Sequence, residues 1–235
     1  DPVGAATASA GDDANGGVVL VGSAGLARPL ACHLAASRRQ GAETAPGGRR
    51  IVLVVIGSVN PVSREQLTLL SGQRDTLVVH LDVKAALQSG EAWQRAAHSV
   101  RQLIRQAAAE GRLPVLTTPG EPADVEVART TGSALGLGPA EVARRIAEAL
   151  SEVAAAALDE TDVAGVVLTG GDTARGLLDR LGAAGIDLIS EVLPGIPFGT
   201  VNGGRRPGLR VVTKAGGFGR PEALAQAVAY LAGLP

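Results

Sequence analysis

The chain has 235 residues, of which 46% are hydrophobic and 19% are charged, and its formal net charge is −1. This composition is typical of a globular protein with a sizeable core; it lacks the basic surplus of nucleic-acid-binding proteins, and no apolar run is long enough to span a membrane. The single cysteine, Cys32, excludes an internal disulfide framework and is compatible with a reducing cytosol, so we expect a cytoplasmic protein without nucleic-acid or membrane partners.

The first predicted elements precede residue 51. Residues 1–17 are mainly Gly, Ala, Ser and Asp, which predicts a flexible tail. A short buried strand is predicted at 18–22, a helix follows it, and the composition of residues 41–50 predicts a linker. The sequence contains no methionine, even at position 1, so we expect the chain to be processed, trimmed or a piece of a longer polypeptide.

Strands and helices alternate along the rest of the sequence. Apolar runs rich in β-branched residues predict strands, the fourth with a turn, at 51–58, 76–81, 114–118, 165–171, 186–193 and 209–214. Helices are predicted at 63–71, 91–110, 139–158, 172–182 and 221–233. Ser63 and Gln66 have the spacing of a capping box, and Pro221 occupies a first helical position. This order predicts an α/β fold with a mostly parallel, doubly wound sheet that carries helices on both faces.

Short stretches rich in Gly and Ser follow several predicted strands. They are GSAG at 22–25, GSVNP at 57–61, TGGDTA at 169–174 and KAGGFG at 214–219. In doubly wound folds, ligands bind beyond the carboxyl ends of the strands. Glycine lets backbone N–H groups approach an anion closely, and a helix N-terminus favours negative charge. We therefore predict a phosphate site, to which Ser58 or Thr173 adds a hydroxyl donor and Lys214 adds a positive charge.

Each of these residues also has a simpler structural interpretation. A glycine pair after a strand is commonly a tight turn, Lys214 alone fits a solvated strand end, and Asp172 and Thr173 fit a helix N-cap. Neither the Walker pattern nor the GxGxxG fingerprint is present. The three histidines lie far apart without metal-ligand spacing, so no protein metal site is predicted. Glu191, before a Pro-Gly turn, has two interpretations: a ligand of Mg²⁺ through water, or an ordinary strand-end carboxylate.

Two long segments resemble a known family. GGDTARGLLDRLGAAGIDLISEVLPGIPFGTV and LRVVTKAGGFG are similar to the C-terminal nucleotide-binding domain of the four-carbon acid sugar kinase family, and IVLVVIGSVNPVSREQL resembles that domain's opening strand and turn. VVLVGSAGLARPLA resembles the closing segment of the family's N-terminal, substrate-binding domain. By this resemblance, residues 18–45 are the end of the substrate-binding domain with a linker, and residues 46–235 are the nucleotide-binding domain. The segments 41–50 and 118–138 contribute little to it.

The resemblance implies ATP-dependent phosphorylation of a small sugar acid such as threonate, erythronate or an oxo-tetronate, with Mg²⁺ as cofactor. Asp172 and Lys214 are the candidate catalytic residues: Asp172 orients the metal unless it only caps its helix, and Lys214 neutralises charge on the transferring group. The residues implied to bind ATP are Ser58, Gly170, Gly171, Asp172, Thr173, Gly216 and Gly217.

The chain departs from the family because only the last stretch of the substrate-binding domain is recognisable in it. A general base and the groups that bind the acid are expected mainly in the missing part. Two other functions therefore stay open: a nucleotide-binding module without catalysis, and a Rossmann-type oxidoreductase, against which the missing GxGxxG argues. The acceptor acid and the formation of a homo-oligomer also stay open.

Overall fold

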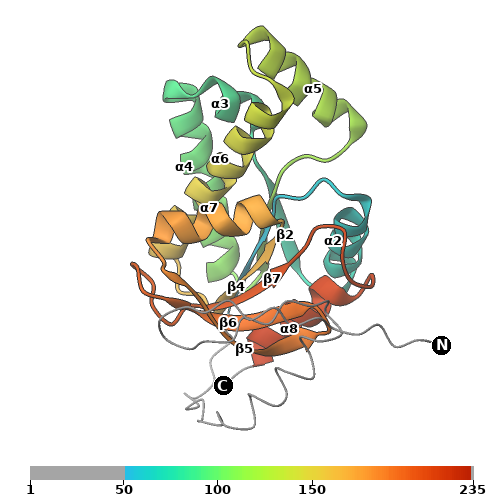
Figure 1. Cartoon of the computed structure of the whole chain (residues 1–235), viewed down its shortest axis with the longest axis vertical. Coiled ribbons are helices and arrows are strands. Elements are labelled where there is room, and N and C mark those ends of the chain that lie inside the picture. Colours follow the sequence, from blue (N-terminus) through green and yellow to red (C-terminus); the bar gives the residue numbers. More distant parts are fainter. Residues whose placement is uncertain (1–50, 234–235) are drawn as a thin grey trace, which may run out of the picture. The chain divides into compact units, whose positions relative to one another are not determined.

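The computed structural model describes residues 51–233. The predictions for the tail at 1–17, the strand at 18–22, the linker at 41–50 and Cys32 lie outside the described residues. In the described part, a twisted sheet lies between two layers of helices, and a further group of helices lies beyond one end of the sheet (Figure 1). The α/β architecture predicted from the alternation of apolar runs is therefore confirmed.

The sheet has seven strands in the order β2-β3-β1-β4-β7-β6-β5. Their bounds are β1 (Val52–Ile56), β2 (Thr76–His80), β3 (Leu113–Thr117), β4 (Gly165–Thr169), β5 (Gly185–Leu193), β6 (Ile196–Asn202) and β7 (Arg210–Lys214). The neighbouring pairs β2-β3, β3-β1, β1-β4 and β4-β7 are parallel, whereas β6 is antiparallel to both β7 and β5. The sheet is thus mixed, with a parallel majority as expected and an antiparallel edge.

Helices cover both faces of this sheet, which confirms the doubly wound prediction. Their bounds are α2 (Pro61–Gln73), α3 (Val83–Gln88), α4 (Gly90–Ala109), α5 (Pro122–Ala134), α6 (Pro139–Glu160), α7 (Gly171–Leu181) and α8 (Ala223–Gly233). Side chains of α4, α6 and α7 share one buried cluster with the sheet, and those of α2 and α8 share a second one. Figure 1 shows α3 and α5 beyond the sheet, at the end opposite β5 and β6.

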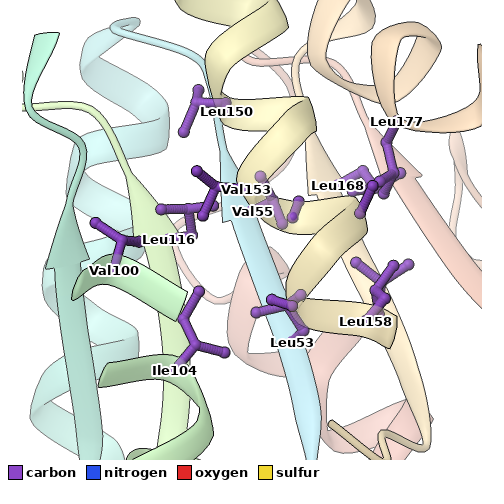
Figure 2. Close-up of a cluster of buried hydrophobic side chains, with 14 of the residues drawn as sticks. Leu53, Val55, Val100, Ile104, Leu116, Leu150, Val153, Leu158, Leu168 and Leu177 are labelled. Atoms are coloured by element: carbon purple, nitrogen blue, oxygen red, sulfur yellow. The ribbon is translucent and has the colours of Figure 1, made fainter. Parts of the chain in front are cut away.

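The central strand β1 shows how the two cores are built. Its five residues are all buried, because side chains of a strand alternate between the two faces and both faces are covered. Leu53 and Val55 belong to the cluster of α4, α6 and α7, where Figure 2 shows Leu53 near Leu158 and Val55 near Val153. The other three residues of β1, Val52, Val54 and Ile56, belong to the cluster of α2 and α8. A continuous apolar run in the sequence is therefore the signature of this doubly buried strand.

Strand β6 and helices α3 and α5 were not predicted. β6 carries Pro197, which normally argues against a strand, but the pairing with β7 covers only Phe198 to Thr200, and the pair of Pro197 with Glu191 of β5 lies next to a register irregularity. Helix α5 buries only Gly132 and so lacks an apolar stripe. Its start is nevertheless well defined, since Pro122 occupies the first turn and the Glu121 N–H donates to the Asp124 carboxylate at 3.0 Å.

The start of α2 also differs from the prediction. The N-cap is Asn60, whose side-chain oxygen accepts a hydrogen bond from the Val62 N–H at 3.0 Å. Ser63 and Gln66 lie inside the helix and are buried, so the capping-box prediction is wrong. The predicted helix start at Pro221 is wrong by two residues, because α8 begins at Ala223. Within residues 51–233, no helix is both long enough and apolar enough to cross a membrane.

Candidate functional site

A cavity of about 710 Å³ lies at the carboxyl ends of β1 and β4. One wall is formed by the loops that follow these strands, Gly57–Asn60 and Gly170–Thr173. The other wall is mostly apolar and is built by α5, α6 and the turn between them. Its apolar side chains are Val125, Ala128, Leu137, Pro139, Val142, Ala143, Ile146 and Ala147, and its polar ones are Asp124, Arg129 and Ser133. The cavity thus has a glycine-rich end and an apolar end, a combination typical of small-molecule sites.

The strand order explains why the cavity opens at this point. β1 and β4 are parallel neighbours. The connection after β1 leads into α2 on one face of the sheet, whereas the connection after β4 leads into α7 on the other face. Two loops that diverge in this way leave a crevice beyond the strand ends, and ligands of doubly wound sheets bind there.

The loop after β4 directs a helix N-terminus at the cavity. Gly170 is the N-cap of α7 and has φ 107° and ψ 130°, a conformation that is strained for any residue with a Cβ. No side chain caps this end. The first N–H groups of an α-helix have no intrahelical partner, so those of Gly171, Asp172 and Thr173 are suited to bind an anion.

Asp172 lies exposed in the first turn of α7 and lines the cavity. Its interpretation as the N-cap is wrong, because Gly170 has that position. Thr173 is 2% exposed and also lines the cavity. A Cβ on Gly57 would lie only 1.8 Å from the Thr173 hydroxyl oxygen, and the Gly57 N–H donates to the Thr169 carbonyl at 3.0 Å. The glycine at 57 therefore lets the loops after β1 and β4 pack directly against each other.

Lys214 turns back into its own loop. The side chain is 3% exposed, and its ammonium donates hydrogen bonds to the carbonyls of Ala215 (2.8 Å), Gly216 (3.3 Å) and Phe218 (3.0 Å). Burial lowers the pKa of Lys214 to about 8. An ammonium has three N–H donors, and three carbonyls accept from this one. The solvated strand-end interpretation is therefore wrong, and the side chain binds backbone instead.

Two buried side chains of α2 bind the same loop. The Ser63 hydroxyl donates to the Gly216 carbonyl at 2.6 Å. The two N–H groups of the Gln66 amide are shared among three successive carbonyls, those of Phe218 (3.1 Å), Gly219 (3.3 Å) and Arg220 (2.9 Å). Carbonyls of the segment 215–220 therefore face inward, toward α2 and Lys214.

The glycines of this loop pack against two residues that line the cavity. A Cβ on Gly216 would lie 2.1 Å from the Ser58 hydroxyl oxygen, and one on Gly217 would lie 2.9 Å from the Asn60 side-chain nitrogen. Ser58 and Asn60 line the cavity, whereas residues 214–219, all of them described, are not among its lining. The predicted residues that meet in the cavity are thus Ser58, Gly170, Gly171, Asp172 and Thr173.

Several lining residues were missed by the sequence analysis. Asn60 precedes Pro61, and an Asn before a proline at the first helical position is a usable N-cap signal. The apolar wall on α5 had no such signal. Glu191, weighed as a ligand for Mg²⁺, accepts a hydrogen bond from the Gly195 N–H at 3.3 Å in the turn between β5 and β6. Within residues 51–233, no group of three or more His, Cys, Asp or Glu side chains could hold a metal ion.

The sequence and fold match known proteins. A family model described as the nucleotide-binding C-terminal domain matches residues 53–224. A D-threonate kinase from Bordetella bronchiseptica is 36% identical over 209 residues, which are 89% of this chain and 45% of the kinase. A D-erythronate kinase from Heliobacterium modesticaldum is 27% identical over 219 residues, which are 91% of this chain and 48% of that kinase. The chain therefore spans less than half the length of either relative.

A solved structure is similar as well. A crystal structure from Bordetella bronchiseptica, described as a domain-swapped dimer with bound citrate, has a TM-score of 0.60 and 34% sequence identity. The match covers 78% of this chain and 41% of the crystallised chain. The family model includes the loops after β1, β4 and β7, so the match contains the residues that form the cavity and its support. The chain belongs to the nucleotide-binding C-terminal domains of the four-carbon acid sugar kinase family.

Proposed function

We propose that this chain is the nucleotide-binding part of an ATP-dependent kinase that phosphorylates a hydroxyl group of a four-carbon sugar acid. Threonate, erythronate and oxo-tetronates are the acceptor class. The observation that carries this proposal is the cavity between the loops Gly57–Asn60 and Gly170–Thr173, with an uncapped helix N-terminus at one end. The names of the related kinases support the choice of acceptor.

In this proposal ATP lies along the cavity. Its phosphates contact the backbone N–H groups at the start of α7 and the hydroxyl of Ser58, because the positive end of a helix favours anions. Its base lies against the apolar side chains of α5 and α6. Phosphoryl transfer depends mainly on positioning and on neutralising charge, which fixed N–H groups supply without a covalent step.

Mg²⁺ is the metal that such a reaction requires, and when bound it would neutralise charge on the phosphates. The Asp172 carboxylate is an oxygen ligand at the rim of the cavity, and Mg²⁺ commonly takes one or two carboxylates together with phosphate oxygens and water. Asp172 would therefore hold the ion. Lys214 would reach a phosphate only by giving up its bonds to the loop carbonyls, so we assign the catalytic contact to Asp172.

The groups that bind the acid and accept its proton would come from the substrate-binding domain of the family. A nucleotide-binding module without catalysis is the second candidate function, because the cavity by itself accounts for nucleotide binding and no described residue is assigned to the acid. We further propose that the protein self-associates, as in the domain-swapped Bordetella structure, and that it acts in the cytoplasm, where ATP is supplied. Light scattering at two protein concentrations measures the self-association.

Isothermal titration tests the nucleotide proposal. We expect MgATP and MgADP to bind with one-to-one stoichiometry, whereas NAD⁺ does not compete with them. Exclusive binding of NAD⁺ would favour the oxidoreductase and overturn the proposal. ADP release measured with D-threonate, D-erythronate and an oxo-tetronate then separates a kinase from a binding module. Turnover with one acid and no turnover with acetate supports the kinase.

A further inference from the structure

We infer that Lys214 is a positioning residue, whose ammonium acts as a built-in cation that holds the loop 215–220 in the conformation that supports Ser58 and Asn60. The consequence for nucleotide affinity rests on the proposed function, whereas the role of Lys214 in the loop does not.

The ammonium of Lys214 donates three hydrogen bonds to the loop that follows it. Its three acceptors, the carbonyls of Ala215, Gly216 and Phe218, lie within a stretch of four residues and converge on one point. Carbonyl dipoles that converge repel one another unless a positive group lies between them. Hydrogen bonds from a charged donor are stronger than those from a neutral one, so the ammonium stabilises a turn that the backbone alone disfavours.

The surroundings of Lys214 are polar but uncharged. The adjoining elements contribute Ser63 and Gln66 from α2 and Thr169 from β4, which is the register partner of Lys214. Within the described residues, no carboxylate forms an ion pair with Lys214. A buried charge without a counter-ion is costly, so the loop carbonyls are what make it tolerable.

The loop 215–220 packs against Ser58 and Asn60, which line the cavity. The carbonyl of Gly216 accepts hydrogen bonds from both Lys214 and Ser63, while the Cα of the same glycine packs against Ser58. Gly217 packs against Asn60, which also caps α2. A displacement of the loop therefore moves the two side chains on the β1 side of the cavity. Lys214 acts on the ligand through these residues and not by direct contact.

The sequence offers a matched control for this inference. Lys84 is the only other lysine, and it lies exposed on α3. Protein labelled with ¹⁵N-lysine should give two side-chain ammonium signals. Below its pKa, the ammonium of Lys214 should exchange protons with water far more slowly than that of Lys84, because only Lys214 is buried and bonded. Equally fast exchange of both signals would overturn the inference.

Variants separate the charge of Lys214 from the space that it fills. Lys214→Met keeps the length but removes the donors, so amide hydrogen exchange in residues 215–220 should rise, and the dissociation constant for MgADP should rise about tenfold or more. Lys84→Met should change neither. Ser63→Ala removes one bond to the loop without touching the charge, and a smaller effect in the same direction is expected. Wild-type protection of the loop in Lys214→Met would contradict the inference.

Chemical rescue distinguishes a positioning cation from a side chain needed only for folding. In Lys214→Ala, ammonium or methylammonium ions should restore loop protection and nucleotide affinity in a concentration-dependent way, whereas sodium at equal ionic strength should not. Absence of rescue in a folded Lys214→Ala protein would count against a cation role. If wild-type protein binds no nucleotide but the loop still depends on Lys214, the proposed function fails and this inference stands.

Discussion

The two glycine-rich loops at 170–173 and 214–219 look alike in sequence but have opposite orientations. The first follows β4 and directs the N–H groups of a helix N-terminus at a cavity. The second follows β7, turns its carbonyls toward α2 and Lys214, and packs its glycines against the loop after β1. In the proposed function, glycine serves ligand approach in the first loop, whereas in the second loop it allows close packing against the loop after β1. The direction of the peptide groups, which composition does not reveal, distinguishes the two roles.

The largest effect is expected from a change in the first loop. Gly170→Ala forces a Cβ onto a residue with φ 107°, at a cost of about 1–3 kcal/mol in the free energy of unfolding. Relief of this strain would turn the start of α7 away from the cavity, and we expect the affinity for MgADP to fall about 100-fold, as for the loss of several N–H contacts. Calorimetry and thermal unfolding measure the two effects. Unchanged affinity would contradict a role of this helix N-terminus in phosphate binding.

A smaller effect is expected in the second loop, because Gly216 acts through Ser58. In Gly216→Ala the new Cβ would lie 2.1 Å from the Ser58 hydroxyl oxygen and would displace that side chain. We expect MgADP to bind about tenfold more weakly. The double variant with Ser58→Gly should regain part of this loss, because the side chain that clashes is absent. Strictly additive effects in this double-mutant cycle would show that the two residues are not coupled.

The free energy of unfolding should depend on pH through Lys214, whose pKa is lowered by burial to about 8. An unfolded lysine keeps its proton up to about pH 10.5, whereas folded Lys214 releases it near pH 8. Between these values the unfolded chain binds more protons, so the contribution of Lys214 to the free energy of unfolding rises with pH. Urea denaturation of wild-type protein and Lys214→Met at pH 8 and pH 10 measures this difference. A contribution that falls with pH would mean that the folded-state pKa is not lowered.

The smallest effect is expected for a glycine that belongs to neither loop. A Cβ on Gly72, near the end of α2, would meet no atom within 4 Å. Gly72→Ala should raise the free energy of unfolding by up to about 1 kcal/mol, because alanine loses less conformational freedom in a helix. Nucleotide affinity should stay unchanged. A loss of affinity here would show that substitutions in α2 disturb the cavity without any specific contact.

The sequence was sufficient for the elements whose signals are local. β1 is an uninterrupted apolar run because it is buried on both faces, and α6 begins at a proline after a glycine. The role of Ser63 and Gln66 was not readable, since their partners lie about 150 positions away in the chain. Their capping-box spacing was a coincidence of local pattern. α5 escaped prediction because a helix that buries only Gly132 needs no apolar stripe.

The candidate site was predictable in its residue types but not in its division of roles. Ser58 and the residues 170–173 were expected at the strand ends, and the structure brings them together in one cavity. Gly216 and Gly217 were expected beside the phosphates; in the structure they pack against Ser58 and Asn60, and their contact with a nucleotide stays a prediction. A Gly-Gly pair after a strand looks the same in sequence whether its partner is an anion or another loop.

The most direct test of the nucleotide site is a crystal structure of this chain with Mg²⁺ and a non-hydrolysable ATP analogue. We expect the phosphates of the analogue within hydrogen-bond distance of the N–H groups of Gly171–Thr173 and its base against the apolar side chains of α5 and α6. Phosphates bound away from these N–H groups, or an analogue bound outside the cavity between β1 and β4, would contradict this expectation.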